Sequence, residues 1–453
     1  MTRWLPVLGI AGIVLAFAAG PAAAQQAGPA AAPVTVVQSH MLAPIGMPAA
    51  AAAFDPVKAT NAYLARVSGE AKARSDSYFE GGYWLILLDT LWTLAISALL
   101  MWSRVSAAIR DFAERRTRSP FWQVPLYAGP YILLSTAMTF PLTIFESFFR
   151  EKAYGLMNQT FFGWFGEFLT VTGVDLILYT IASTFLYLAL RRAGRTWWMW
   201  ATGGFAVFFA VVILISPVLL APLTNKYTSL PDSPLKHDIL SLARANGIAA
   251  TDVFVFDASK QSDRISANVS GLFGTTRISL NDNLLEKGSH DEVLAVLGHE
   301  MGHYVLNHQT VQITWLSLLA LVAFLFLDAG FAVLAGIFGG NWDVRRIDDP
   351  AGLPVLVALA AVFLMFATPV LNTMTRTTEI QADMYGVNAA RKPDAFATSV
   401  LKLANYRKLD PAPWEEAIFY DHPSGRTRIW EMMRWKAEHL NDPDIKAGPV
   451  SPQ

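Results

Sequence analysis

The chain has 453 residues, of which 53% are hydrophobic and only 16% are charged, and its mean hydropathy is positive. This combination is rare in a soluble globular protein and is typical of a multi-pass membrane protein. The formal net charge of −1 gives no electrostatic case for nucleic acid binding, and the absence of cysteine excludes disulfides, thiolate metal ligands and a cysteine nucleophile. Any metal must be bound by His, Asp or Glu.

The first residues have the pattern of a secretory signal. Arg3 supplies positive charge, an apolar run extends from Leu5 to Ala19, and small residues lead up to Ala24. We therefore expect a signal peptide over residues 1–24 and an Ala/Pro-rich linker over residues 25–56. An uncleaved anchor helix is the alternative, which the short run disfavours because a comfortable span needs about 20 residues.

Six long apolar segments follow, and each is long enough to cross a bilayer as a helix. They lie at about Tyr83 to Trp102, Val124 to Ser147, Val171 to Leu190, Trp197 to Leu220, Ile313 to Phe338 and Leu353 to Met374. The chain should therefore divide into a four-span membrane region (57–223), a polar region (224–310), two further spans (311–374) and a second polar region (375–453). We expect an all-α multi-pass membrane protein with a small α+β region.

Basic residues between the spans predict the orientation of the chain. Five arginines lie from Arg104 to Arg118 and three from Arg191 to Arg195, whereas the intervening loop has only Arg150 and Lys152. A signal peptide together with such Ala-rich sequence suggests a bacterial cell, so we expect the protein in the inner membrane with its arginine-rich loops in the cytoplasm. An odd number of spans separates both polar regions from these loops, so we expect both on the periplasmic side.

The first polar region contains short elements that lead to a helix. A helical pattern covers Leu235 to Ala245, and runs at Val253 to Asp257 and Arg277 to Leu280 predict strands. Ser289 and Glu292 then form a capping box, which predicts the start of a helix.

That helix contains the sequence His299-Glu300-Met301-Gly302-His303. Residues four apart share a helix face, so both imidazoles can bind one metal ion while Glu300 stays beside it. Zinc with three protein ligands keeps an open position for water, whose proton a neighbouring carboxylate can accept. Two unrelated histidines on a surface helix are the alternative, which the apolar stretch from Leu294 to Leu297 disfavours. We predict one zinc ion per chain, with Glu300 as the base.

The third ligand must lie elsewhere, and the chain after the last span offers Glu379 and Asp383. These acids are four apart on an expected helix, so one can bind zinc while the other hydrogen-bonds a ligating histidine. The residues alone leave open which acid is the ligand. Solvated charges at a helix end are the remaining alternative.

Several motifs in the same order resemble those of the CAAX prenyl endopeptidase family, a group of integral-membrane zinc metallopeptidases. The resemblance covers most of the chain from about Phe54 onward. It rests on the zinc motif with His308 five residues later, on Arg376, Glu379, Ala382 and Asp383 in that spacing, on Pro222 to Tyr227 after the fourth span, and on His422-Pro423 followed by Arg428.

The resemblance implies a zincin-like catalytic region and helices that enclose an intramembrane chamber. It implies Glu379 as the third ligand, which leaves Asp383 to support a histidine, and it implies that His422 and Arg428 stabilise the oxyanion of the reaction intermediate. It also implies an edge strand near Asn268 that binds the substrate as an added strand.

We therefore expect a zinc-dependent endopeptidase that cleaves peptide or protein substrates at or within the membrane, surrounded by lipid and without nucleic acid. In a bacterial cell, processing or quality control of membrane or envelope proteins fits better than a prenylated substrate. A non-catalytic scaffold or transporter with a structural zinc is the alternative, which Glu300 and the open fourth position disfavour. A serine or aspartic protease is supported only by Asp89, Asp175 and Asp328 within the spans, without a pairing motif.

Overall fold

The structure is a computed structural model of the chain, and it describes residues 54–270 and 276–446. The predicted signal peptide and residues 25–53 of the predicted linker lie outside these residues.

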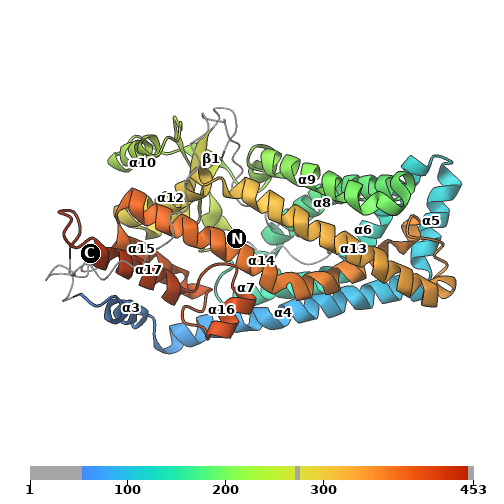
Figure 1. Ribbon diagram of the computed structural model, residues 1–453, viewed down its shortest axis with the longest axis horizontal. Helices are drawn as coiled ribbons and strands as arrows, with labels where there is room; N and C mark the ends of the chain where they lie inside the picture. The colour runs from blue at the N-terminus through green and yellow to red at the C-terminus, as the bar shows by residue number, and fades with distance from the viewer. Residues whose placement is uncertain (1–53, 271–275, 447–453) are drawn as a thin grey trace, which may run out of the picture.

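Long apolar helices run along the longest axis of the molecule (Figure 1). They are α4 (Gly69–Trp102), α6 (Pro120–Ile144), α8 (Phe161–Ala193), α9 (Trp197–Ile215), α13 (His308–Trp342) and α14 (Leu353–Ala390). The π-helical segments η1 (Phe145–Arg150) and η3 (Ser216–Leu220) continue α6 and α9. Each of the six predicted spans lies within these elements.

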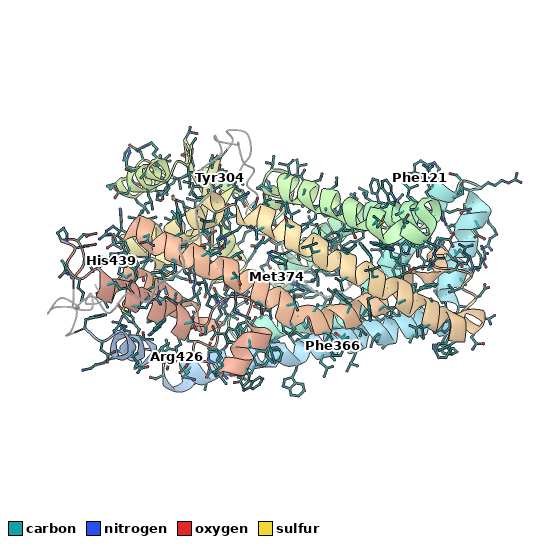
Figure 2. All side chains as sticks on the ribbon, viewed as in Figure 1. Phe121, Tyr304, Phe366, Met374, Arg426 and His439 are labelled. Carbon is teal, nitrogen blue, oxygen red and sulfur yellow. The ribbon has the colours of Figure 1, made fainter. Side chains whose placement is uncertain are left out.

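Five helical stretches among the described residues are long and apolar enough to cross a membrane. The number is five rather than six because the stretch Phe161–Leu223 contains both α8 and α9. Large apolar side chains project outward from these helices, and Phe366, labelled in Figure 2, is 73% exposed. Such exposure of apolar side chains suits contact with lipid rather than water.

Shorter elements connect the long helices and build the ends of the molecule. The α-helices are α3 (Pro56–Leu64), α5 (Val105–Arg116), α7 (Glu151–Ala153), α10 (Pro234–Ala245), α11 (Asp282–Lys287), α12 (His290–Val305), α15 (Pro393–Lys402), α16 (Pro413–Phe419) and α17 (Gly425–Glu438). The 3-10 turns are η2 (Gly194–Thr196), η4 (Ala221–Leu223), η5 (Ala258–Lys260), η6 (Pro350–Gly352) and η7 (Leu403–Asn405).

A four-stranded sheet packs beside α12 in the order β1-β2-β4-β3. Its strands are β1 (Tyr227–Ser229), β2 (Val253–Phe256), β3 (Ala267–Ser270) and β4 (Arg277–Asn281). β2 and β4 pair in parallel, whereas β1 pairs antiparallel with β2 and β3 pairs antiparallel with β4. The two strands predicted from the polar region are β2 and β4, and β3 lies at an edge. The strand β1 was not predicted, because three residues are too few to show an alternating pattern.

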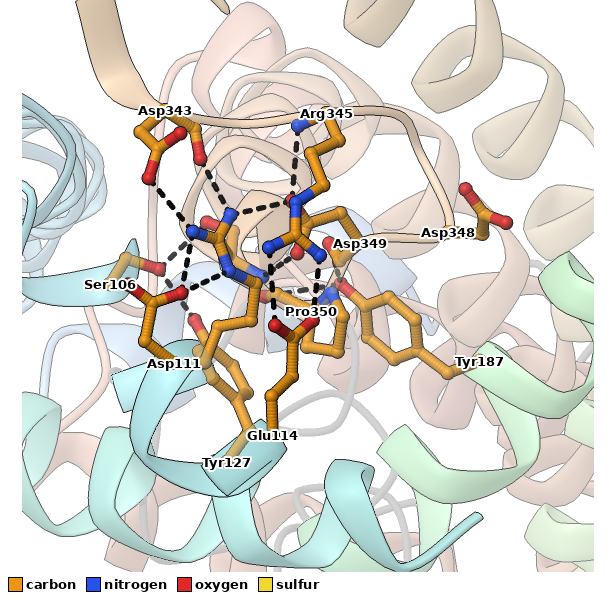
Figure 3. A network of polar contacts seen from close by, with 12 residues as sticks. Ser106, Asp111, Glu114, Tyr127, Tyr187, Asp343, Arg345, Asp348, Asp349 and Pro350 are labelled. Carbon is orange, nitrogen blue, oxygen red and sulfur yellow. Dashed lines mark hydrogen bonds and ion pairs between the residues drawn. The ribbon is translucent and has the colours of Figure 1, made fainter. Parts of the chain in front are cut away.

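The two polar regions meet at one end of the long helices, where α10, α12, α15 and α17 lie (Figure 1). The helix α5 lies at the other end. There the buried Arg110 of α5 contacts Asp343 and Asp349 in the connection between α13 and α14 (Figure 3). The predicted fold class, a helical membrane protein with a small α+β region, is confirmed. Which end faces the periplasm stays a prediction.

Candidate metal centre

The helix α12 starts at the predicted capping box. The Ser289 hydroxyl accepts a hydrogen bond from the Glu292 amide, and the Glu292 carboxylate accepts one from the Ser289 amide. Further along, Leu297 and Met301 are fully buried against the strands of the sheet. Because one face of α12 is held against the sheet, the histidines at positions 299 and 303 face away from it, toward α14.

Small residues let α12 and α14 approach each other closely. A Cβ atom on Gly302 would lie 3.1 Å from the Ala382 carbonyl oxygen, and one on Gly386 would lie 2.6 Å from the backbone nitrogen of His299. A larger side chain at either position would push the helices apart. Gly298 and Gly302 lie four residues apart on one face of α12, and this spacing is a signal in the sequence from which the close contact could have been predicted.

Two histidines and one carboxylate converge between these helices. The Nε2 atoms of His299 and His303 are 3.1 Å apart. The Glu379 carboxylate oxygens lie 3.3 Å from Nε2 of His299 and 3.4 Å from Nε2 of His303. The three candidate ligand atoms all lie within 4.8 Å of one another. The structure thus places Glu379, and not Asp383, inside the cluster.

Asp383 lies behind His299. Its Oδ1 atom is 2.7 Å from Nδ1 of His299, and Arg428 of α17 donates to both carboxylate oxygens at 2.8 and 2.5 Å. Burial alone would lower the pKa of His299, but hydrogen bonds and charge from Asp383 and Glu379 raise it to about 10. The ring therefore holds a proton firmly unless a metal ion takes that proton's place.

The donor set of the cluster fits a zinc ion. Nδ1 of each histidine faces another side chain, Asp383 for His299 and His308 for His303, so the lone pairs available for a metal lie on the Nε2 atoms. Glu379 Oε2 is buried, and its contact in the cluster is with Nε2 of His299 at 3.3 Å. The buried carboxylate therefore needs either a proton on that ring or a metal ion to balance its charge. Two imidazoles and a carboxylate are a common donor set of catalytic zinc.

Of the other predicted site residues, His422 and Glu300 lie beside the cluster, whereas Arg428 and Asn268 lie outside it. His422 is beside it, with Nε2 3.3 Å from Glu379 Oε1 and Nδ1 3.0 Å from Asp421. Glu300 follows His299 on α12, and burial raises the pKa of its carboxyl group above the ordinary value. Arg428 reaches Asp383 rather than His422, so its predicted contact with the oxyanion stays a prediction. Asn268 lies on the edge strand β3, outside the cluster.

One cation beside His422, Arg407, was not predicted from the sequence. Arg407 Nη2 lies 3.3 Å from Nδ1 of His422 and its Nη1 lies 3.6 Å from Asp421. No spacing pattern links Arg407 to the zinc motif more than 100 residues earlier, so only the folded chain shows this neighbour.

Comparisons with known proteins show which family the chain resembles. A family model described as CAAX prenyl protease N-terminal, five membrane helices, matches residues 58–226, and the model of peptidase family M48 matches residues 229–436. A rice protein named CAAX prenyl protease 1 homolog is 26% identical over 375 residues, which cover 79% of this chain and 86% of the rice protein. The CAAX prenyl protease 1 of Saccharomyces cerevisiae is 29% identical over 327 residues, which cover 67% and 70% of the two chains. An uncharacterized metalloprotease of Bacillus subtilis is 27% identical over 333 residues, which cover 73% and 78%.

The crystal structure of Saccharomyces mikatae Ste24p has the same fold. The TM-score is 0.66 at 22% identity, and the match covers 83% of this chain and 94% of that chain. The predicted arrangement of helices around a chamber, with a small α+β region at one end, is that of the shared fold. The two family models together extend from residue 58 to residue 436 in an order that agrees with the motifs. The chain therefore belongs to peptidase family M48 and is a membrane metalloprotease of the CAAX prenyl protease type.

Proposed function

We propose that the protein is a zinc-dependent endopeptidase that hydrolyses polypeptides at or within the membrane. The observation that carries the proposal is the convergence of His299, His303 and Glu379 from two helices into one partly buried cluster. These three residues would hold the zinc ion, and the fourth position would stay open for water.

The chemistry follows from the groups around the cluster. When bound, zinc lowers the pKa of a water molecule and polarises the carbonyl group of the substrate. Glu300 accepts the proton of the attacking water and returns it to the leaving amine. The raised pKa of Glu300 brings this carboxyl group closer to neutral pH, where a group can both accept and donate a proton efficiently.

His422 is the proposed donor to the oxyanion. Its Nε2 atom points to the cluster, and a donor held there stabilises the negative charge that gathers on the carbonyl oxygen. Asp383 and Arg428 act one step away, since Arg428 holds Asp383 and Asp383 orients the ring of His299. A direct contact of Arg428 with the oxyanion is a separate proposal, and it would use Nη1, because Nε and Nη2 donate to Asp383.

The substrate is proposed to bind as an added strand along β3. Among the strands that the structure describes, β3 pairs only with β4, and it contacts α12, which carries the zinc motif. An extended peptide can pair with the open backbone of such an edge. The side chain of Asn268 on this strand would hold the substrate backbone.

The protein is proposed to act in a bacterial inner membrane, with the metal centre on the periplasmic side. The arginines of the α5 end support this orientation, because that end lies opposite the metal centre (Figure 1). Processing or quality control of membrane or envelope proteins is the proposed duty. The rice and Saccharomyces cerevisiae relatives are named CAAX prenyl proteases, and the duty proposed for this chain does not depend on a prenylated substrate.

The variant Glu300→Gln tests the proposal most directly. It removes the base but no zinc ligand, so the purified protein should contain about one zinc per chain and should fail to cleave fluorescently labelled casein. The matched control is Glu286→Gln, which changes an exposed glutamate on α11 and should leave cleavage unchanged. Cleavage by Glu300→Gln at the parent rate would contradict the assigned role of Glu300.

A further inference from the structure

The two histidines of the metal centre have different partners behind them. Nδ1 of His299 faces the carboxylate of Asp383 at 2.7 Å, and Arg428 balances the charge of that carboxylate. Nδ1 of His303 faces Nδ1 of His308 at 2.9 Å, and Nε2 of His308 lies 3.0 Å from Oε1 of Gln381. One imidazole is therefore supported by a charged pair and the other by a histidine and an amide.

The contact between two ring nitrogens requires one of them to donate a proton and the other to accept it. If the Gln381 amide NH₂ donated to His308 Nε2, His308 would carry its proton on Nδ1 and would donate to His303. His303 would then carry its own proton on Nε2, where a metal ligand needs a lone pair. If Gln381 Oε1 instead accepts from His308 Nε2, His308 has a lone pair on Nδ1 and accepts a hydrogen bond from Nδ1 of His303. Nε2 of His303 then has a lone pair that can bind a metal ion. Only the second arrangement is compatible with a metal at the cluster.

The fold places His308 for this contact. The preceding residue, Asn307, has a φ of 55°, a left-handed conformation that asparagine adopts more readily than most residues. This residue ends the path of α12 and starts α13, so the chain turns and the side chain of His308 comes back over His303. His308 is only 3% exposed, whereas Gln381 on α14 is exposed.

We propose that His308 and Gln381 form a neutral relay that sets the tautomer and the orientation of His303. Both are positioning residues, because neither reaches the position of the metal. The proposal rests on the proposed zinc site. It adds that α14 supports both histidines. Asp383 of α14 contacts His299 directly, and Gln381 of α14 supports His303 by way of His308.

Zinc affinity measured by competition with a fluorescent chelator tests the relay. Gln381→Leu removes the acceptor and should weaken zinc binding by about 10- to 100-fold, the usual range for a partner of a metal-binding histidine. Gln381→Glu keeps an acceptor at this position and should retain the parent affinity. With cobalt in place of zinc, Gln381→Leu should also change the visible absorption spectrum, which reports the geometry of the ligands.

The double variant distinguishes a relay from two separate contributions. Because Gln381 acts only through His308, the affinity of His308→Ala should not fall further when Gln381→Leu is added. The control is His290→Ala. His290 lies on α12, the helix of the zinc motif, but its side chain is half-exposed and contacts Asp238 of α10 at 2.9 Å. Since Gln381 is exposed, Gln381→Leu should fold, and its melting temperature without metal checks this.

Two results would overturn the relay. One is a folded Gln381→Leu protein with the parent zinc affinity and cobalt spectrum, and the other is additive loss of affinity in the double variant. Failure of the proposed function would look different, because the parent protein would then lack zinc or Glu300→Gln would still cleave casein.

Discussion

Buried charged residues lie at both ends of the long helices, and their hydrogen bonds differ. At the α5 end, the guanidinium group of Arg110 donates to the side chain of Asp111, to both the carbonyl and the carboxylate of Asp343, and to Asp349 (Figure 3). A guanidinium group has five N–H donors, and these contacts use all of them. This cluster is complete without any added group.

At the metal centre, two imidazoles and a carboxylate converge on one point. The nearby cations Arg428 and Arg407 are directed to Asp383 and to the far side of His422. The Glu379 carboxylate is therefore balanced by a proton on His299, whose place a metal ion can take. The comparison teaches that burial of charge alone does not mark a functional site. A buried centre whose proton a metal ion can replace does.

Replacing Glu379 should have the largest effect, because it removes a proposed ligand and a negative charge from the incomplete cluster. Glu379→Gln should be purified without zinc and without casein cleavage, as measured by elemental analysis and a fluorescence assay. Asp383→Asn should retain more zinc, with affinity reduced by about 10- to 100-fold. If Asp383→Asn lost zinc and Glu379→Gln kept it, Asp383 would be the ligand.

Removing Arg110 should break the complete cluster and leave the metal centre intact. The Arg110 and Asp349 side chains are both 3% exposed, and Arg110→Ala leaves the charge of Asp349 without its cation. We expect the free energy of unfolding to fall by about 3–5 kcal/mol, while zinc per folded chain stays at the parent value.

Arg346→Ala is the matched control for Arg110→Ala. Its side chain is 81% exposed and lies in the same connection between α13 and α14, so its loss should change stability by about 0.5 kcal/mol or less. Denaturant unfolding in detergent measures both variants. Equal stability of Arg110→Ala and Arg346→Ala would show that the Arg110 cluster does not stabilise the fold.

His422→Ala should reduce turnover by about 10²- to 10³-fold, the usual effect of removing an oxyanion donor, with zinc content unchanged. The control is His237→Ala, whose side chain is 69% exposed beside Asp232. Steady-state kinetics and elemental analysis are both needed. Loss of zinc from His422→Ala would instead identify His422 as a ligand.

The orientation of the two ends can be established without changing any interaction. A reporter enzyme that is active only outside the cytoplasm should be active when fused at Gln453 and silent when fused after Arg116. The reason is that the arginines of the α5 end keep that end in the cytoplasm. The opposite pattern at both positions would place the metal centre in the cytoplasm.

Local patterns were sufficient to predict several parts of this protein. The apolar segments predicted the helices α4, α6, α8, α9, α13 and α14, since about 20 apolar residues are legible without any tertiary contact. The capping box at Ser289 and the spacing of His299 and His303 depend on helix geometry alone. The capping box and the histidine pair involve residues at most four positions apart, and the spans are continuous apolar segments, so each is visible in the sequence.

The remaining features depend on contacts between residues far apart in the chain. The spacing of Glu379 and Asp383 put both on one helix face, but the close packing of α12 on α14 decided that Glu379 enters the cluster and Asp383 meets Arg428. The same packing brought Gln381 to His308. Local periodicity determines which face of a helix a side chain occupies. Which helix that face meets, and at what distance, is determined only when the helices pack.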